Sequence, residues 1–552
     1  MTPEELSKTI KESLESLIAS QKLEVSVIPE IKIERPKSKE HGDFSSNIAL
    51  MVAKPAGKNP RDVAQLLVDD LSKNPGIKKI EIAGPGFLNF TLDSASLGEL
   101  ARTIIEQSDK YGHTDSLKGE TINIEFISAN PTGPLHLGHT RWAAVGDAIA
   151  RVLAASGAKV VREFYVNDRG SQLDKFGASI CAAANNEAIP EDGYHGVYVK
   201  DLAAEIVKEK PQILKLSKSE QVIEFREEGY KKQLKQQQNV LDDFRTHFDT
   251  WTSERSLHSS GAVEKGLAVL KKHGHVFELD GATWLRTTDF GDDKDRVLIK
   301  ADGEYTYFAS DTAYYVDKRS RGNDVNIYLL GADHHGYVNR LRAVAACAGD
   351  NPDKNVEVLI GQLVKMLKNG QEVRLSKRAG NIITLEDLVE EVGTDAARYT
   401  LTRYPVDTPL TLEIDLLTSH TNDNPVFYVQ YAHARISAVI RSAQEKGIDW
   451  QKSNFNPAVL VTQQEAELLG ALSEFPRIVS SAAQLREPHR VARYLEELAT
   501  AYHSFYSACR VLPMNDDAVT DETIARLMLC AATRQVIKNG LDLLGVSAPE
   551  KM

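Results

Sequence analysis

Cysteine is scarce in this sequence, and its placement excludes the usual cysteine-based frameworks. The 552 residues include four cysteines, and none stands in a CxxC pair or near histidines at the spacing of a zinc site. They are Cys181, Cys347, Cys509 and Cys530. We therefore expect neither a disulfide scaffold nor a protein-bound structural metal.

Long apolar runs are also absent. No segment approaches the roughly 18 consecutive apolar residues of a membrane-spanning helix. The start of the chain, Thr2-Pro-Glu-Glu5, is a capping box with proline at the first helical position. It has neither the apolar core of a signal peptide nor the acid-poor composition of a transit peptide. These features predict a cytoplasmic protein with no membrane partner.

Basic residues are not in excess. The formal net charge is −12, whereas a nucleic-acid binder is first sought by a basic excess. Residues 421–552 hold 13 Lys and Arg against 15 Asp and Glu. Any RNA-binding surface must therefore depend on local segregation of charge, or on aromatic side chains that stack with splayed bases.

The most informative segment is Ser128–His139, which reads Ser-Ala-Asn-Pro-Thr-Gly-Pro-Leu-His-Leu-Gly-His. Before it, residues 121–127 alternate in polarity, which predicts a β-strand. After it, apolar residues recur at helical spacing from Trp142 until Gly157 ends the pattern. A second strand is predicted at 159–166. This order is typical of half a doubly wound α/β sheet, which binds ligands at the carboxyl ends of its strands.

The loop and the start of the helix offer groups that suit a nucleotide. Gly138 has no side chain, so a base or sugar could lie against its backbone. Unpaired amides at the helix start attract anions, and His136 and His139 could donate to charge that develops on a phosphate. The alternative is two surface histidines at a helix start. The surrounding strand, proline-rich turn and helix favour the nucleotide site.

A basic segment more than two hundred residues later completes a pair of motifs. It reads Arg374-Leu-Ser-Lys-Arg378, and together with His136-Leu-Gly-His139 it resembles the HIGH and KMSKS signatures of class I aminoacyl-tRNA synthetases. Arginine replaces the first lysine of the second signature, and the other lysine is kept. The resemblance implies that Lys377 stabilises the pyrophosphate leaving group, and that Arg374 and Ser376 bind ATP. Taken alone, the segment could be a solvated basic loop.

Further stretches narrow the resemblance to arginyl-tRNA synthetases of the bacterial type, over nearly the whole chain. These stretches are Ser128-Ala-Asn-Pro-Thr-Gly-Pro134, Phe164-Tyr-Val-Asn-Asp-Arg-Gly-Ser-Gln172, Gly331-Ala-Asp-His-His-Gly-Tyr337 and Val429-Gln-Tyr-Ala-His-Ala-Arg435. The resemblance implies ATP-dependent ligation of L-arginine to tRNA(Arg) through an arginyl-adenylate, with release of AMP and pyrophosphate. It also implies Mg²⁺ with the ATP, a need for bound tRNA before activation, and a monomer.

A pocket selective for arginine needs carboxylates, because a guanidinium is a planar, permanently charged group that paired acceptors bind best. Tyr307 and Asp311 are four residues apart and would share one face of a helix. The resemblance implies that both hold the substrate, that Glu254 is the second carboxylate, and that Asn130 contacts the amino acid. The alternatives are a packed aromatic ring at Tyr307 and a helix N-cap at Asp311. Two adjacent histidines without a second ligand cluster are expected to line the same pocket: His334 and His335.

The predicted architecture has three parts. Residues 111–405 form a Rossmann-like, doubly wound α/β catalytic core, interrupted around 185–250 by an exposed helical insertion rich in Lys, Glu and Gln. Residues 1–110 form an α+β N-terminal domain. Residues 406–552 form an all-α bundle, in which a sustained apolar stripe predicts two buried aromatic residues: Tyr502 and Phe505.

The same resemblance assigns tRNA recognition to the two outer domains, the D-loop to the first and the anticodon to the last. It implies four contact residues, two in each outer domain: Phe87, Asn89, Tyr431 and Met552. The family often has tyrosine where Phe87 stands, so stacking could persist here without the hydroxyl hydrogen bond. The alternative for Phe87 and Asn89 is a pair of ordinary strand residues after a Gly-Pro turn.

Two other functions are compatible with these motifs. One is a different adenylyl-transferring enzyme of the same superfamily, such as another class I synthetase or a small-molecule ligase. The other is a non-catalytic tRNA-binding paralogue. That reading is disfavoured because such a protein would have no chemical reason to keep His136, His139 and Lys377.

Overall fold

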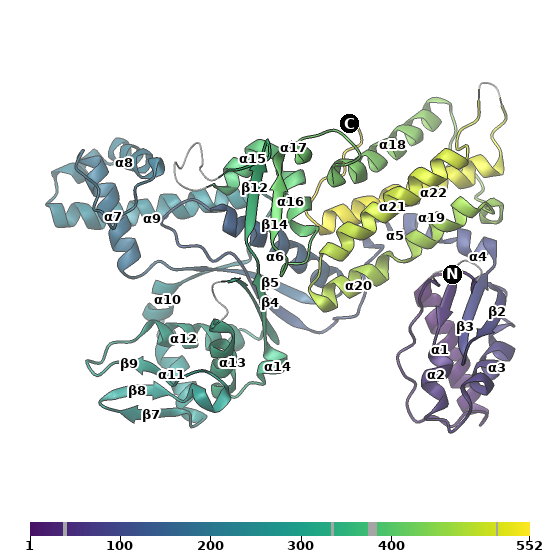
Figure 1. The fold of residues 1–552 in the computed structure, drawn as a ribbon, viewed down its shortest axis with the longest axis horizontal. Coiled ribbons are helices and arrows are strands. Elements are labelled where there is room, and N and C mark those ends of the chain that lie inside the picture. Colours follow the sequence, from purple (N-terminus) through teal and green to yellow (C-terminus); the bar gives the residue numbers. More distant parts are fainter. Residues whose placement is uncertain (37–40, 333–335, 374–382, 515–516) are drawn as a thin grey trace.

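A computed structural model describes residues 1–36, 41–332, 336–373, 383–514 and 517–552. A parallel sheet lies at the centre of the molecule, an α+β domain at one end and a helical lobe at the other, and a helical bundle extends from the core above the α+β domain (Figure 1). This arrangement confirms the predicted combination of a Rossmann-like core, an α+β N-terminal domain and an all-α C-terminal bundle.

The central sheet has five parallel strands in the order β11-β10-β4-β5-β6. Its strands are β4 (Thr121–Glu125), β5 (Lys159–Val166), β6 (Thr250–Ser253), β10 (Val325–Gly331) and β11 (Val356–Gly361). The chain builds outward from β4 on one side and then returns to its other side with β10. Ligands of doubly wound sheets bind at this kind of switch point, outside the carboxyl ends of the strands.

Helix α6 (Leu137–Ala155) follows β4 and is almost entirely buried. Its close approach to the sheet depends on Gly146, where an added Cβ would lie 2.4 Å from Cγ of Phe126. Only glycine leaves room for this crossing, because a contact under 3 Å would force the helix away from the strand end. The ring of Phe126 is 0% exposed, so the middle of α6 packs directly against the residue that follows β4.

The N-terminal domain packs helices against a three-stranded antiparallel sheet of order β1-β3-β2. Its elements are α1 (Pro3–Ala19), β1 (Phe44–Ser46), α2 (Ile48–Ala53), α3 (Pro60–Leu71), β2 (Ile77–Ala83), β3 (Phe87–Leu92), α4 (Ser94–Gly98) and α5 (Leu100–Gln107). The predicted capping box is present, since Thr2 accepts from the backbone of Glu5 and the Glu5 side chain accepts from Thr2 N.

The helical lobe consists of α7 (Ser171–Ala184), α8 (Val197–Glu209) and α9 (Lys218–Asp243). It projects from the core (Figure 1) and has a hydrophobic cluster of its own, which includes Phe176 and Phe225. The predicted helical character is correct. The predicted exposure is wrong for part of α9, where Gln233 and Gln237 are 0% and 1% exposed, because these glutamines face the core and not solvent.

A smaller subdomain is formed mainly by the residues between β6 and β10, and two helices that follow β10 complete it. It contains α10 (Glu254–Ser259), α11 (Ala262–Lys272), an antiparallel sheet β7-β8-β9 (Val276–Leu279, Ala282–Leu285, Arg296–Ile299), α12 (Tyr307–Ser320), α13 (Tyr337–Cys347) and α14 (Pro352–Asn355). The predicted helix that carries Tyr307 and Asp311 is therefore present as α12.

The C-terminal third begins with a small sheet of order β13-β12-β14 and ends in a helical bundle. Strand β14 lies within 406–552, so the start of that range is not helical as predicted. Its elements are β12 (Val364–Lys368), β13 (Gln371–Glu372), α15 (Leu385–Val392), α16 (Thr394–Thr402), β14 (Leu410–Glu413), α17 (Ile414–Leu417), α18 (Pro425–Glu445), α19 (Gln463–Ser473), α20 (Phe475–Leu485), α21 (His489–Ala508) and α22 (Asp521–Leu543). Tyr502 and Phe505 are 0% exposed, as the apolar stripe predicts.

A buried arginine on α16 ties the core to the C-terminal tail. Arg398 is 0% exposed, and its guanidinium bonds to Asp147 Oδ2 on α6 at 2.6 Å. It also donates to Phe244 O at 2.8 Å and to Leu544 O at 3.0 Å. These bonds join the Rossmann core, the end of α9 and the residues after α22 at a single side chain.

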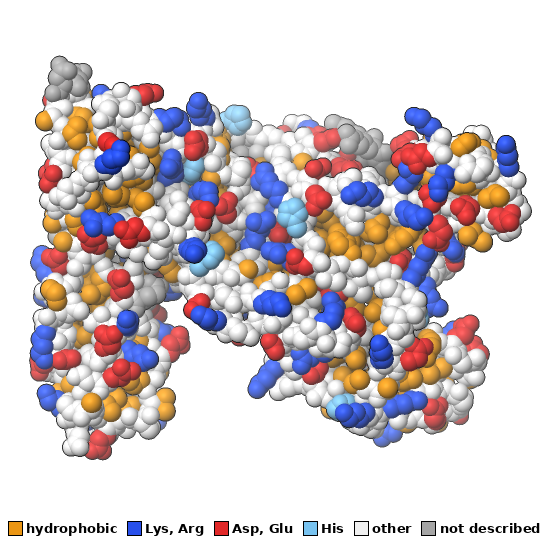
Figure 2. Space-filling view, turned by 180° about the vertical axis from the view of Figure 1, so that it is seen from behind, with side chains coloured by type: hydrophobic (Ala, Val, Ile, Leu, Met, Phe, Trp, Pro, Cys, Tyr) orange, Lys and Arg blue, Asp and Glu red, His pale blue; other side chains and the backbone are white. Residues whose placement is uncertain are grey.

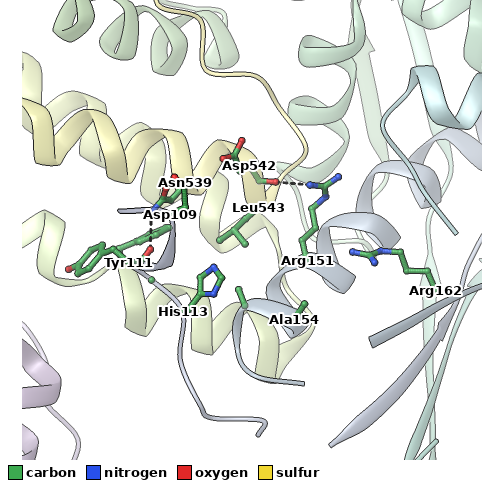
Figure 3. Close-up of a pocket in the computed structure, with 12 residues that line it drawn as sticks. Asp109, Tyr111, His113, Arg151, Ala154, Arg162, Asn539, Asp542 and Leu543 are labelled. Carbon is green, nitrogen blue, oxygen red and sulfur yellow. Dashed lines mark hydrogen bonds between the residues drawn. The ribbon is translucent and has the colours of Figure 1, made fainter. Parts of the chain in front are cut away.

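A cavity of ≈ 290 Å³ lies where the linker after α5 crosses the core and α22 (Figure 3). There, Asn539 Nδ2 donates to Tyr111 O at 3.0 Å, and Arg151 Nη1 donates to Asp542 O at 3.2 Å. Arg151 stands at the end of α6 opposite to His136, and a helix of this length spans about 28 Å. The cavity therefore belongs to the junction between domains and not to the predicted nucleotide site. In the part of the chain that is described, no helix is long and apolar enough to cross a membrane.

Candidate active site

The first motif lies at the start of α6, as predicted. His136 is the N-cap, and its Nδ1 accepts from Gly138 N at 3.1 Å, while His136 N donates to His139 Nδ1 at 3.3 Å. The two imidazole rings lie 3.7 Å apart between centroids. Desolvation lowers the pKa of His136, and burial together with the charge of His136 lowers the pKa of His139 to about 3. Both rings are therefore neutral near pH 7, until a ligand adds negative charge beside them.

The side chain of His136 lies beside Gly138. A Cβ built there would lie 2.9 Å from Cε1 of His136. The motif's own histidine thus occupies the space beside this glycine. Gly138 allows the His136 ring to fold back over the helix start, and any nucleotide that packs against this backbone would have to share the site with that ring.

The loop before the motif leaves β4 through a strained turn. Ile127 and Ser128 have φ of 69° and 44°, in the left-handed region that residues with a side chain seldom adopt. Ser128 Oγ donates to Glu125 Oε1 at 2.9 Å and accepts from Tyr165 N at 3.1 Å. These two bonds hold the turn and direct the following residues across the carboxyl ends of β4 and β5.

The second motif lies outside the described residues, and with it the predicted Arg374, Ser376 and Lys377. The residues directly after it are described, and they pair with the first motif. Leu137 N donates to Ile383 O at 2.8 Å, and Leu385 N donates to Leu135 O at 2.8 Å. Residues 383 and 385 thus lie beside the HLGH motif, and the pairing of the two signatures stays a prediction. His334 and His335 also lie outside the described residues.

The two predicted carboxylates of the arginine pocket lie on neighbouring helices. Glu254 begins α10 and is 3% exposed, and Asp311 lies in the second turn of α12. Burial, with help from the charges of Asp311 and Asp168, raises the pKa of Glu254 to about 7 against the opposing effect of Arg169. Burial raises the pKa of Asp311 to about 6. Among the described residues, neither carboxylate has a salt-bridge partner, and the charges of Arg169 and Arg340 do not offset the effect of burial.

Tyr337 is a residue of this site that the sequence reasoning did not single out. Its hydroxyl donates to Asp311 Oδ2, and this bond and the charge of Arg340 both act to lower the pKa of Asp311. Tyr337 ends the stretch Gly331–Tyr337, which the family resemblance had already marked. The sequence pattern indicated its neighbours His334 and His335, because histidine is a common residue of functional sites.

Tyr307 and Asn130 complete the predicted pocket. Tyr307 is the first residue of α12 and is 67% exposed, and Thr306 is the N-cap. This excludes both a packed aromatic at Tyr307 and an N-cap role for Asp311. The Tyr307 hydroxyl faces Gly170, where a Cβ would lie 2.9 Å from it. Asn130 is half-buried, and its Nδ2 donates to Gln172 Oε1 at 2.6 Å.

A cavity of ≈ 520 Å³ opens beside Gly170. Its lining carries charges of both signs, from two aspartates and three arginines: Asp168, Asp174, Arg169, Arg226 and Arg255. Asp168 is held by Ser253 Oγ at 2.6 Å and by Arg255 N at 3.0 Å. These bonds fix the end of β6 and hence the position of Glu254, which is the next residue after Ser253.

The predicted tRNA contacts differ in their accessibility. Phe87 is 41% exposed, but Asn89 on the same central strand is only 8% exposed. Tyr431 is 38% exposed and stacks with Phe427, with ring centroids 5.9 Å apart and an interplanar angle of 6°. Met552 is 57% exposed. On the face in Figure 2, basic and acidic side chains are interspersed.

Three family models match the chain. They are "Arginyl tRNA synthetase N terminal domain" over residues 4–92, "tRNA synthetases class I (R), catalytic domain" over 101–404 and "DALR anticodon binding domain" over 429–552. Arginine–tRNA ligases of Frankia alni and Renibacterium salmoninarum are 52% and 54% identical to the chain, and each alignment covers 100% of both proteins. The arginyl-tRNA synthetase structure of Thermus thermophilus has the same fold, with a TM-score of 0.76 over 100% of both chains at 23% identity.

Proposed function

The chain belongs to the arginyl-tRNA synthetase family, and from that premise we propose how its residues carry out the reaction. The enzyme catalyses ATP-dependent ligation of L-arginine to tRNA(Arg) through an arginyl-adenylate, and it releases AMP and pyrophosphate.

The observation that carries the residue assignment is the pair of carboxylates at Glu254 and Asp311. Burial disfavours the charged form of each carboxylate, which is the main reason that their pKa values rise to about 7 and about 6. A guanidinium supplies the missing charge and can bond to both in a planar, bidentate manner. Tyr307, at the start of α12, and Asn130, in the loop after β4, then contact the substrate.

The adenylation site is proposed at the start of α6. The carboxylate of arginine attacks the α-phosphate of ATP, and pyrophosphate leaves. His136 and His139, together with the free amides of the helix start, stabilise the negative charge that develops on the phosphates. Lys377 neutralises the leaving pyrophosphate, with Ser376, Arg374 and Gly138 completing the ATP site. The pairing of Ile383 and Leu385 with the first motif supports placing the second motif there.

The second step transfers arginine to the terminal ribose hydroxyl of tRNA. We assign D-loop recognition to residues 1–110, with Phe87 and Asn89, and anticodon recognition to 406–552, with Tyr431 and Met552. Residues 111–405, with the insertion around 185–250, form the catalytic part. Mg²⁺ enters bound to the phosphates of ATP, its usual form in such sites. The enzyme acts as a cytoplasmic monomer.

One experiment tests the reaction and its order. Purified protein is offered total tRNA with each of the twenty amino acids, and charging should occur with arginine alone. ATP–pyrophosphate exchange with arginine should be negligible without tRNA and should appear when tRNA is added. Charging of another amino acid would overturn the substrate, and robust exchange without tRNA would overturn the proposed order.

A further inference from the structure

The helical lobe of α7, α8 and α9 holds the backbone of the segment that carries Asn130. Gln237 Nε2 on α9 donates to Asn130 O at 3.0 Å and to Gly133 O at 2.8 Å. The Tyr198 hydroxyl on α8 donates to Thr132 O at 2.9 Å. Three carbonyls within four residues therefore accept hydrogen bonds from a lobe that has its own hydrophobic core.

The segment has few means of fixing its own path. Pro131 and Pro134 lack a backbone N–H and cannot donate within the loop. Directly before them, Ile127 and Ser128 hold left-handed backbone conformations, which persist only where the surroundings enforce them. The position of Asn130 thus depends on contacts from outside the segment.

Gln237 is oriented toward the segment and little else. It is 1% exposed, its amide donates twice to the segment, and its Oε1 has no hydrogen-bond partner among the described residues. Here the pairing is one-sided, and the paired side faces Asn130 and Gly133.

We infer that the lobe supports the arginine-facing segment, and that Gln237 and Tyr198 are positioning residues for arginine recognition that act through Asn130. The inference rests on the role proposed above for Asn130. A shift of about 1 Å at a reacting group can lower a rate by about 10²-fold. Loss of these bonds should therefore impair the use of arginine, while ATP binding, which depends on the start of α6, should change little.

The test compares two variants with two matched controls in tRNA charging by the full-length enzyme. Tyr198→Phe removes one hydrogen bond and should raise the KM for arginine by about three- to tenfold. Gln237→Leu removes two and should lower kcat/KM for arginine by roughly ten- to hundredfold. The KM for ATP should stay within about twofold of the parent in both. The controls carry the same changes nearby: Tyr194→Phe and Gln238→Leu, each expected to behave as the parent.

A parallel rise of the KM for arginine and ATP would overturn the inference, since it would indicate general damage to the fold. Unchanged arginine kinetics in Tyr198→Phe would overturn it too, and this mild variant decides the question if Gln237→Leu does not fold. Gln237→Leu should also have a smaller effect in an Asn130→Ala background than in the parent. Equal effects would exclude Asn130 as the intermediary. A parent enzyme that fails to charge arginine would instead refute the proposed function.

Discussion

The charge of Asp311 on α12 raises the pKa of Glu254 on α10. The acidic side chain on α12 thus opposes the ionisation of the one on α10, and in the described part of the chain neither has a salt-bridge partner. These carboxylates lower the stability of the folded protein and favour binding of a cation. Functional sites often reduce stability in this way.

Arginine recognition should weaken on acidification. The pKa values of Glu254 and Asp311 are raised to about 7 and about 6, so both carboxylates lose charge between pH 8 and pH 5.5. Since a guanidinium binds the charged forms, kcat/KM for arginine should fall by about tenfold or more from pH 8 to pH 6. Steady-state charging across this range measures the effect, with the KM for ATP as the reference. Glu254→Gln should remove the step near pH 7, and a flat arginine profile would contradict the assignment.

Asp311→Asn should separate substrate binding from stability. Removing one carboxylate of a buried charge pair with the guanidinium costs about 3 to 5 kcal/mol, so the KM for arginine should rise by roughly 10² or more while the KM for ATP changes little. Without arginine, the raised pKa means that the folded protein holds a proton that the unfolded chain has released, and stability falls as the pH rises from about 4 to about 7. The variant should therefore melt at or above the parent's temperature at pH 8.

A matched control for that variant is Asp317→Asn on the same helix, where the carboxylate pairs with Arg321 at 3.1 Å and is 33% exposed. It should leave the KM for arginine unchanged. If Asp311→Asn keeps the parent's KM for arginine, Asp311 is not a substrate ligand.

Two substitutions at His136 should distinguish catalysis from helix capping. Asparagine is a good N-cap residue and alanine is not, so His136→Asn should keep the stability of α6, and His136→Ala should lower it by about 1 kcal/mol. Both should lower kcat by about 10² to 10³ because the imidazole is lost. Urea unfolding and charging kinetics give the two readouts, with tRNA binding measured separately. Normal kcat in His136→Asn would remove His136 from the catalytic residues.

Arg398→Met should destabilise the fold more than any surface ion-pair change. The substitution leaves buried carbonyls at Phe244 and Leu544 without their donor, and it takes one of the cations from Asp147. We expect a loss of about 3 kcal/mol in the free energy of unfolding, seen as a lower urea midpoint. Lys452→Ala breaks the exposed pair with Asp449 and should change stability by less than about 0.5 kcal/mol. Similar midpoints for the two variants would refute this role of Arg398.

Tyr431→Ala should weaken tRNA binding without affecting the small substrates. An exposed ring that stacks on a base contributes about 1 to 3 kcal/mol, so the Kd for tRNA should rise about five- to a hundredfold. Phe290→Ala is the control, since Phe290 has the same 38% exposure but lies in the subdomain between β6 and β10. Equal tRNA affinity in the two variants would exclude Tyr431 as a contact.

Local patterns in the sequence predicted a large part of this site. The alternation in 121–127 and the spacing after Trp142 gave the strand and helix around the first motif, because burial of one face imposes a fixed period. The four-residue interval between Tyr307 and Asp311 indicated a shared helix, which is α12.

Features that depend on tertiary contacts were not predictable in this way. The run of lysine and glutamine at 231–238 indicates a solvated helix face, yet Gln233 and Gln237 are buried, because the partners of Gln237 are backbone carbonyls about a hundred residues earlier. The His136 ring lies over Gly138 because of its side-chain rotamer, and the spacing of residues in a motif does not determine a rotamer. Tyr337 meets Asp311 only because α12 and α13 pack together.

The bonds of Arg398 have a consequence for recombination between relatives. The Arg398 side chain binds the carbonyls of Phe244 and Leu544 and the carboxylate of Asp147. Three segments that are distant in the sequence must therefore have matching positions around it. In a chimera whose C-terminal bundle comes from a homologue, the residues after α22 that contact Arg398 would come from a different protein. Crossovers that keep residues 147, 244, 398 and 544 from one parent should give folded hybrids far more often than crossovers that divide them.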